Sequence, residues 1–486
     1  MKQQNVSGNK KRKNEQRQIL PGLFAQFPAG LPNSLPTGRN FSSYFCGMNS
    51  IRFYLTGIGM LLFSLNVCSA PKKASTIKRL AADTPMVVPH AKTGAFLEEL
   101  LQSRPQYFTS VLQNRKALKV QVIYTQINRN ANNEPVFTTW NFNIDSSEYF
   151  YPASTVKLPV ALLALQALHQ LSLPGLDKNS TLITEANYNK QSPVYNDAST
   201  KDGRPNVAQY VKKIFMVSDN DAFNRLYEMM GQQYINDKLH RMGYADAEIL
   251  HRLQVSMSPD ENRHTNPISF YDSLGKMLYK QPMLVNTQTY SVRKDSAGSG
   301  YYSNGSLVQH AMDFSAKNRI SLQDLTDILR SVLFPQSVTP QQRFNFTADD
   351  YTFVKKYLSQ LPTESLYPPY SADTAAYWPA YCKFLLYGSE KGPLPPNIRI
   401  FNKVGDAYGF LTDVAYIADF DKKIEFMLSA RIYCNADGIL NDDAYDYEAV
   451  GFPFMKQLGR LIYDYEVKRP RAFQPDLAAF KMIYDK

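Results

Sequence analysis

Apolar and polar residues alternate near both ends of the chain, and apolar residues recur at helical spacing in between. The alternation at 118–127 and 136–144, with Asn-rich turn residues between the two runs, predicts a β-hairpin. Strand patterns return towards the C-terminus at 398–404, 412–417 and 424–433. The two ends of the chain are therefore expected to supply the strands.

The middle of the chain is predicted to be mainly helical. Helical periodicity covers 95–102, 156–171, 207–217, 221–230, 321–333 and 348–361, and a closing helix is expected at 447–467. The run 156–171 is mostly apolar, and Pro159 falls early enough to be tolerated in a first turn. Strands at both ends around a helical middle predict an α+β fold in which the chain ends share one sheet.

Composition divides the chain into a presequence (1–70), a Lys- and Ala-rich linker (71–94), a main domain (95–468) and a C-terminal tail (469–486). Within the main domain, 258–315 is polar and irregular apart from a helix expected at 268–279. We interpret this stretch as an insertion.

Charge is distributed unevenly along an otherwise ordinary globular composition, with 44% hydrophobic and 20% charged residues. The formal net charge is +11, but residues 1–70 hold eight lysines or arginines and a single acid. The rest of the chain is only mildly basic, so nucleic acid is not expected as a partner.

The presequence has the pattern of a secretory signal over 48–70. A short basic stretch precedes an apolar run at 53–67, which is too short for a transmembrane helix, and small residues follow. We expect an exported, periplasmic or extracytoplasmic protein. Translation would start at Met48, or an N-terminal extension would precede the signal. Anchoring of a lipoprotein through Cys68 is a second interpretation, which Val67 disfavours.

Two cysteines, Cys382 and Cys434, would remain in the mature chain. Export permits a disulfide between them, and two buried free thiols are the alternative. The six histidines are scattered and lack the paired spacing of a metal site. We expect neither a metal nor another cofactor.

Candidate chemistry begins with Ser154-Thr-Val-Lys157, directly ahead of the apolar run. Residues three apart share one face of a helix, so Lys157 could take the proton of the Ser154 hydroxyl and make it a nucleophile. The same S-x-x-K spacing begins at Ser7, Ser69, Ser75, Ser273 and Ser291. By itself the motif is therefore uninformative, and Ser154 alone would be interpreted as a helix cap.

Two further motifs follow in order. Ser218-Asp219-Asn220 is the one S-D-N in the sequence, and Lys403-Val404-Gly405 is a K-x-G within a predicted strand. S-x-x-K, S-D-N and K-[ST]-G in this order are typical of class A β-lactamases and penicillin-binding proteins. The sequence resembles that superfamily over roughly 95–468, and the resemblance extends to 191–194 (QSPV) and 239–243 (LHRMG).

The resemblance implies an antiparallel sheet packed against helices, a helical subdomain and an acyl-enzyme mechanism. Ser154 would become acylated, with Lys157 as its base. Ser218 would relay a proton to the leaving nitrogen, held in place by Lys403. Asn220 would contact the substrate amide and Lys157, whereas Asp219 is expected to be a structural cap.

The resemblance also implies a surface for the substrate. Backbone N–H groups of Ser154 and Asp406 would form an oxyanion hole. Gln191, Val404 and Gly405 would lie along the bound substrate.

Two departures from the family pattern affect recognition and turnover. Val404 replaces Thr or Ser and has no hydroxyl for a substrate carboxylate, although Thr412 lies nearby in sequence. A literal K-T-G at 92–94 precedes the nucleophile and is interpreted as chance.

Gln254 stands where class A enzymes have the Glu that activates the deacylating water, and an amide cannot accept that proton. Glu261 is the alternative base.

Three hypotheses follow. The first is a β-lactamase-like serine hydrolase acting on β-lactam or related amide carbonyls. The second is a penicillin-binding or peptidase-like enzyme on cell-wall peptides, for which lactams are trapping inhibitors. The third is an inactive binding module that keeps the fold. We expect a monomer whose partner is a small-molecule β-lactam or peptide-like substrate.

Overall fold

The computed structural model describes residues 92–93, 95–290 and 292–485. The predicted signal sequence, the predicted start at Met48 and Cys68 lie outside the described residues, as does most of the linker. None of the helices within the described ranges is long and apolar enough to cross a membrane.

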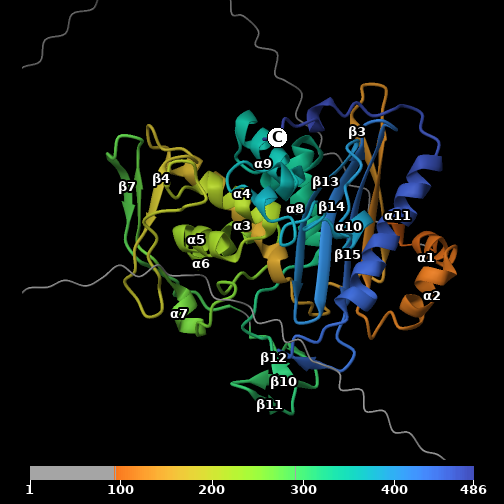
Figure 1. Cartoon of the computed structure of the whole chain (residues 1–486), viewed down its shortest axis with the longest axis horizontal. Helices are drawn as coiled ribbons and strands as arrows, with labels where there is room; N and C mark the ends of the chain where they lie inside the picture. Colours follow the sequence, from red (N-terminus) through yellow and green to blue (C-terminus); the bar gives the residue numbers. More distant parts are fainter. Residues whose placement is uncertain (1–91, 94, 291, 486) are drawn as a thin grey trace, which may run out of the picture. The chain divides into compact units, whose positions relative to one another are not determined.

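A six-stranded sheet forms the centre of the fold (Figure 1). Its order is β1 (Lys92–Thr93), β3 (Pro135–Phe142), β2 (Gln121–Arg129), β15 (Ile424–Tyr433), β14 (Phe410–Asp419) and β13 (Ile398–Ala407). Neighbouring strands are antiparallel except β1, which pairs in parallel with β3. Strands from both parts of the chain share the sheet, which confirms the α+β prediction and the β2–β3 hairpin. Pairing of β1 also places the end of the predicted linker in the sheet.

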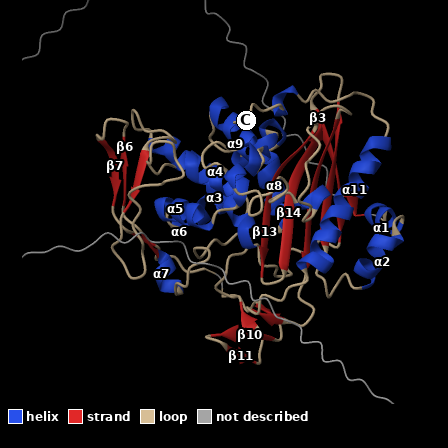
Figure 2. Cartoon of the chain, in the orientation of Figure 1, coloured by secondary structure: helices blue, strands red, loops and turns tan. Residues whose placement is uncertain are grey.

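Helices cover both faces of this sheet (Figure 2). One face packs against α1 (Phe96–Gln102), α2 (Pro105–Gln113), α10 (Phe384–Tyr387) and α11 (Phe452–Lys468). The other face packs against α3 (Lys157–Leu171), α8 (Leu322–Leu333) and α9 (Ala348–Ser359), with α4 (Val207–Val217), α5 (Asn220–Met230) and α6 (Gln232–Arg241) beyond them. Every residue of β14 is buried because this inner strand is covered on both sides.

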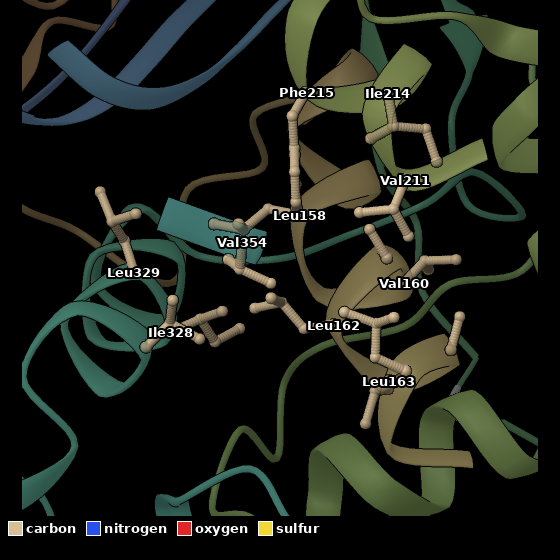
Figure 3. Packing of buried hydrophobic residues seen from close by; sticks show 14 of the residues in the cluster. Leu158, Val160, Leu162, Leu163, Val211, Ile214, Phe215, Ile328, Leu329 and Val354 are labelled. Atoms are coloured by element: carbon tan, nitrogen blue, oxygen red, sulfur yellow. The ribbon is translucent and has the colours of Figure 1, made fainter. Parts of the chain in front are cut away.

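The apolar helix α3 lies at the centre of the helical part. Residues Lys157 to Gln166 are all buried, as expected for a helix that is hydrophobic on every side. Figure 3 shows its leucine and valine side chains packed against Val211 and Phe215 of α4, Ile328 and Leu329 of α8, and Val354 of α9. This packing holds the start of α3 in a fixed position.

The predicted insertion is built from short strands. The helix expected at 268–279 is wrong: this stretch forms the hairpin of β6 (Ile268–Tyr271) and β7 (Met277–Gln281). Leu274 supplied part of the helical spacing, yet its side chain is 92% exposed in the turn between the strands. The remaining small elements are β4 (Thr181–Thr184), β5 (His264–Thr265), β8 (Leu284–Val285), β9 (Ser296–Ala297), β10 (Gly300–Ser303), β11 (Ser306–Val308), β12 (Met312–Asp313), β16 (Ile439–Leu440) and α7 (Pro259–Arg263).

The C-terminal segment packs on the main domain. The predicted closing helix begins with a π-helical turn at Tyr447–Gly451 and continues as α11. Within the predicted tail, Leu477 and Phe480 are buried in the helical core. Cys382 and Cys434 are both buried free thiols, so of the two alternatives for them the disulfide is wrong.

Candidate active site

Ser154 lies in a 3-10 turn, η1 (Ala153–Val156), that leads directly into α3. Strand β13 crosses this turn at Gly405. A Cβ atom at Gly405 would lie 2.6 Å from the carbonyl oxygen of Pro152 and 2.9 Å from the amide nitrogen of Ser154. Because only glycine permits this approach, Gly405 brings the edge of the sheet against the candidate nucleophile.

The S-D-N motif occupies the junction between α4 and α5. Ser218 ends α4 in the left-handed conformation, with φ of 58°, which turns the chain back towards α3. Asp219 caps α5 by accepting a hydrogen bond from the Ala222 amide at 2.8 Å, which confirms its expected structural role. Ser218 and Asn220 are thereby positioned beside Lys157.

Lys157 is completely buried and has four oxygen atoms close to its Nζ. They are Ser154 Oγ at 2.7 Å, Ser218 O at 2.5 Å, Asn220 Oδ1 at 2.7 Å and Ser218 Oγ at 3.3 Å. Burial, followed by the positive charge of Lys403, holds the pKa of Lys157 well below its usual range. This shift favours the neutral amine, which can accept the Ser154 proton.

Lys403 completes the cluster from β13. Its Nζ donates to Ser218 Oγ at 2.8 Å and to the Val404 carbonyl oxygen at 2.7 Å. Burial lowers the pKa of Lys403 to about 8. The Ser218 hydroxyl therefore lies between two lysine amines, an arrangement that can pass a proton from one side of a substrate to the other.

The outer edge of β13 offers a backbone amide near Ser154. The Val404 carbonyl accepts from Lys403 Nζ, so it is directed away from β14. In an antiparallel pair, hydrogen-bonding direction alternates along the strand, so the N–H of Asp406 also points to this edge. Gly405 lies against the Ser154 amide. The N–H groups of Ser154 and Asp406, which are predicted to form the oxyanion hole, therefore belong to segments that adjoin each other, η1 and β13.

The deacylation candidates lie in different settings. Gln254 is exposed, has a left-handed φ of 58°, and its Oε1 accepts from Asn220 Nδ2 at 2.7 Å. Glu261 instead caps α7, where its carboxylate accepts from the Ser258 amide at 2.7 Å and from Lys190 at 3.1 Å. These hydrogen bonds hold the pKa of Glu261 below its usual value. Gln254 therefore adjoins the cluster, while Glu261 is engaged as a helix cap and is a weak base.

Other predicted residues are placed around this centre. Gln191 accepts from two backbone amides of its own loop and donates to the His264 carbonyl at 3.2 Å, so its contact with substrate stays a prediction. The Val404 side chain is buried among the helices on the far face of the sheet. Thr412, also buried, pairs with Gly405. Lys92–Thr93 lies on the sheet edge opposite β13, as expected for a chance motif.

An aromatic cluster behind Ser154 was not predicted. The Tyr151 ring packs against Tyr408 at 5.4 Å and Phe314 at 5.6 Å between ring centroids, and it stacks in parallel with His251. Phe314 belongs to the insertion, which therefore supports the segment that carries the nucleophile. The aromatic run 149–151 was the available signal, but its partners are distant in sequence.

Residues 105–348, half of the chain, match the sequence profile of the β-lactamase enzyme family. The chain belongs to this family. The matched segment contains Ser154, Lys157, Ser218 and Asn220, while Lys403 lies beyond it. Family membership indicates a hydrolase of the β-lactamase and penicillin-binding type.

Among solved structures, this β-lactamase-family chain is similar to several proteins at low identity. A β-lactamase from Xanthomonas campestris is 13% identical, with 75% of this chain and 98% of that chain covered and a TM-score of 0.40. A β-lactamase from Chitinophaga pinensis is 11% identical, with 74% of this chain and 99% of that chain covered and a TM-score of 0.41. The protein PBP-A is 13% identical, with 78% of this chain and 98% of that chain covered and a TM-score of 0.40. No curated protein sequence matched the chain.

No group of His, Cys, Asp and Glu side chains suited to a metal ion occurs within 92–93, 95–290 and 292–485. The cluster itself contains two serine hydroxyls and two lysine amines.

Proposed function

We propose that the protein is a serine hydrolase that attacks β-lactam or related amide carbonyls through an acyl-enzyme on Ser154. The observation that carries the proposal is the 2.7 Å contact between the buried Lys157 amine and the Ser154 hydroxyl. Lys157 in its neutral form takes the hydroxyl proton as Ser154 attacks.

Ser218 serves the second half of the acylation. Its hydroxyl, 3.3 Å from Lys157 and 2.8 Å from Lys403, donates a proton to the leaving nitrogen and regains one from Lys157. The N–H groups of Ser154 and Asp406 stabilise the oxyanion, a contribution of about 2.7–4 kcal/mol per donor in a studied hydrolase.

A second candidate is a penicillin-binding or peptidase-like enzyme acting on cell-wall peptides. Gln254 favours it, because this amide adjoins Asn220 but cannot accept a proton from water. Glu261 is occupied as a cap. The acyl-enzyme would then persist, and lactams would act as trapping inhibitors.

Nitrocefin turnover combined with intact-protein mass spectrometry tests the proposal. The variants are Ser154→Ala and, as a matched control, Ser273→Ala, which removes the serine of a chance S-x-x-K in the exposed β6–β7 turn. Rapid colour change that Ser154→Ala abolishes and Ser273→Ala retains supports the hydrolase.

A stable adduct with the same dependence on Ser154 supports the second candidate. Absence of an adduct with every lactam and activated ester would contradict both and leave the inactive binding module.

A further inference from the structure

A cavity of about 400 Å³ adjoins the loop that carries Gln254. Its lining comes from 250–263, from 289–290 and from 313–317, together with Gln232 of α6. The described residues that line it include none of the catalytic candidates Ser154, Lys157, Ser218 and Lys403. Its volume falls within the range of about 300–1,000 Å³ that is usual for small-molecule sites. It is therefore a candidate binding site distinct from the cluster at Lys157.

Hydrogen bonds join the two sides of this cavity. Asn318 Oδ1 accepts from the amide nitrogen of Leu250 at 2.7 Å and from that of His251 at 3.0 Å. On another side, the guanidinium of Arg263 donates to the Asn286 carbonyl at 2.9 Å. Because these contacts already fix the walls, a ligand can bind without the free-energy cost of ordering them.

Two cations and one acid line the cavity. The amine of Lys317 is half-buried, and within the described part of the chain it forms no hydrogen bond or ion pair. Burial lowers the pKa of Lys317. The second cation, Arg263, donates to backbone carbonyls, which are uncharged. The acid, Asp313, is exposed, and its carboxylate accepts from the Ser315 amide at 2.7 Å. The net positive charge favours an anion as ligand.

His251 adds a hydrogen-bond acceptor to the lining. Its Nδ1 lies 2.5 Å from the Arg252 carbonyl oxygen, which can only accept, so Nδ1 carries the proton. Burial lowers the pKa of His251 to about 4, and the ring is therefore neutral near pH 7. Its Nε2 is buried and has no hydrogen-bond partner among the described residues. This nitrogen is left to accept a hydrogen bond from a bound molecule.

We propose that the cavity binds a small organic carboxylate that also carries a hydroxyl or N–H group. Lys317 pairs with the carboxylate, and His251 Nε2 accepts from the hydroxyl or N–H group. The apolar part of the ligand lies against Val255 and Met257, which also line the cavity. These apolar side chains favour an organic carboxylate over inorganic phosphate. The site does not depend on acylation of Ser154.

Isothermal titration calorimetry with hydroxybenzoates tests the proposal. 3-Hydroxybenzoate and 4-hydroxybenzoate hold the carboxylate and the hydroxyl at two separations. The matching methoxybenzoates lack the donor, the hydroxybenzamides lack the charge, and inorganic phosphate lacks the apolar part. The protein is compared with Lys317→Met and with the control Lys276→Met, which removes an exposed lysine of the β6–β7 turn.

We expect the better hydroxybenzoate to bind about tenfold more tightly than its methoxy and amide analogues, a difference equivalent to roughly 1.4 kcal/mol. Lys317→Met should weaken its binding by about tenfold or more, because a hydrogen bond to a charged group is lost. Lys276→Met should leave the affinity unchanged. Lys317→Gln replaces Lys317→Met if the latter fails to fold.

Four results would overturn the proposal. They are no measurable binding of either hydroxybenzoate at millimolar concentration, binding that the Lys317 variant does not weaken, equal affinity for a hydroxybenzoate and its methoxy analogue, and tighter binding of phosphate than of both hydroxybenzoates. None of them bears on Ser154, so the proposed function is tested separately.

Discussion

Two buried lysines lie on opposite sides of β13, and both donate hydrogen bonds only to uncharged oxygen atoms, but the charges farther from each amine differ. Lys157 contacts only uncharged oxygen atoms, and the nearest strong influence on it is another cation, Lys403. Lys383 donates to Asn402 Oδ1 at 2.6 Å and to the Leu358 carbonyl at 2.8 Å. Asn402 in turn donates to the carboxylate of Asp413 at 2.8 Å.

This difference separates the lysine that we propose as the base from a lysine that we expect to stabilise the fold. Burial lowers the pKa of both, but at Lys383 Cys382 and then Asp413 oppose this effect, and the pKa of Lys383 is about 8. At Lys157 the positive charge of Lys403 adds to the effect of burial, so the pKa of Lys157 lies well below its usual value. Asn402 and Lys403 are consecutive residues, so β13 carries one network on each face.

The largest effect is expected for Lys157→Met. Loss of the base should lower the rate of Ser154 acylation by about 10²–10⁴-fold. The Ser218 carbonyl and Asn220 Oδ1 also lose their donor, so the thermal midpoint should fall and the rate is measured on the folded variant. Single-turnover mass spectrometry and thermal unfolding measure the two quantities. A large fall in stability with little loss of rate would show that Lys157 is structural.

Lys383→Met is expected to lower stability without lowering the acylation rate. Asn402 Oδ1 and the Leu358 carbonyl would lose their donor, which should lower the free energy of unfolding by about 1–3 kcal/mol. Acylation by the folded variant should change little. Denaturant unfolding and the same single-turnover assay test this, and a loss of rate equal to that of Lys157→Met would remove the distinction between the two lysines.

A smaller effect concerns pH. Lys403 carries its charge below its pKa of about 8 and loses it above. If this charge holds the Ser218 hydroxyl, acylation should decline as pH rises through about 8. Lys403→Arg, which keeps its charge, should shift that decline to higher pH. An unchanged alkaline limb in this variant would assign the decline to another group.

The smallest and most local effect is expected for Gln254→Glu. The carboxylate can accept the Asn220 hydrogen bond and also a proton from water, so deacylation should become faster while acylation stays similar. Decay of the adduct mass over time measures it. Decay no faster than in the parent protein would mean that residue 254 does not contact the attacking water.

Much of the fold and the order of the site motifs could be predicted from periodicity and spacing. Apolar residues recur at regular spacing in the long helices and in strands β2, β3 and β13 to β15. The local sequence is therefore enough to predict these elements. The β6–β7 hairpin could not be predicted because Leu274, an exposed turn residue, mimics a helical position. In an element with few apolar residues, their spacing does not distinguish a helix from a strand.

The site was predictable where consecutive residues carry it and not where contacts join distant segments. S-x-x-K and S-D-N identify the residues that meet at Lys157. The spacing of Ser258 and Glu261 is a capping-box pattern that could have revealed the cap of α7. Local sequence does not reveal that Glu261 binds Lys190, nor that Phe314 packs against Tyr151. The network of Lys383, Asn402 and Asp413 likewise depends on tertiary packing.

The pH dependence of Ser154 acylation tests the role of Lys157 most directly. The rate constant is measured by intact-protein mass spectrometry from acid to mildly alkaline pH, in the parent protein and in Lys157→Met. We expect an acid limb with a midpoint well below the usual lysine pKa, and we expect the variant to lack it. A rate that rises in proportion to hydroxide across the whole range, or the same acid limb in Lys157→Met, would contradict a neutral Lys157 as the base.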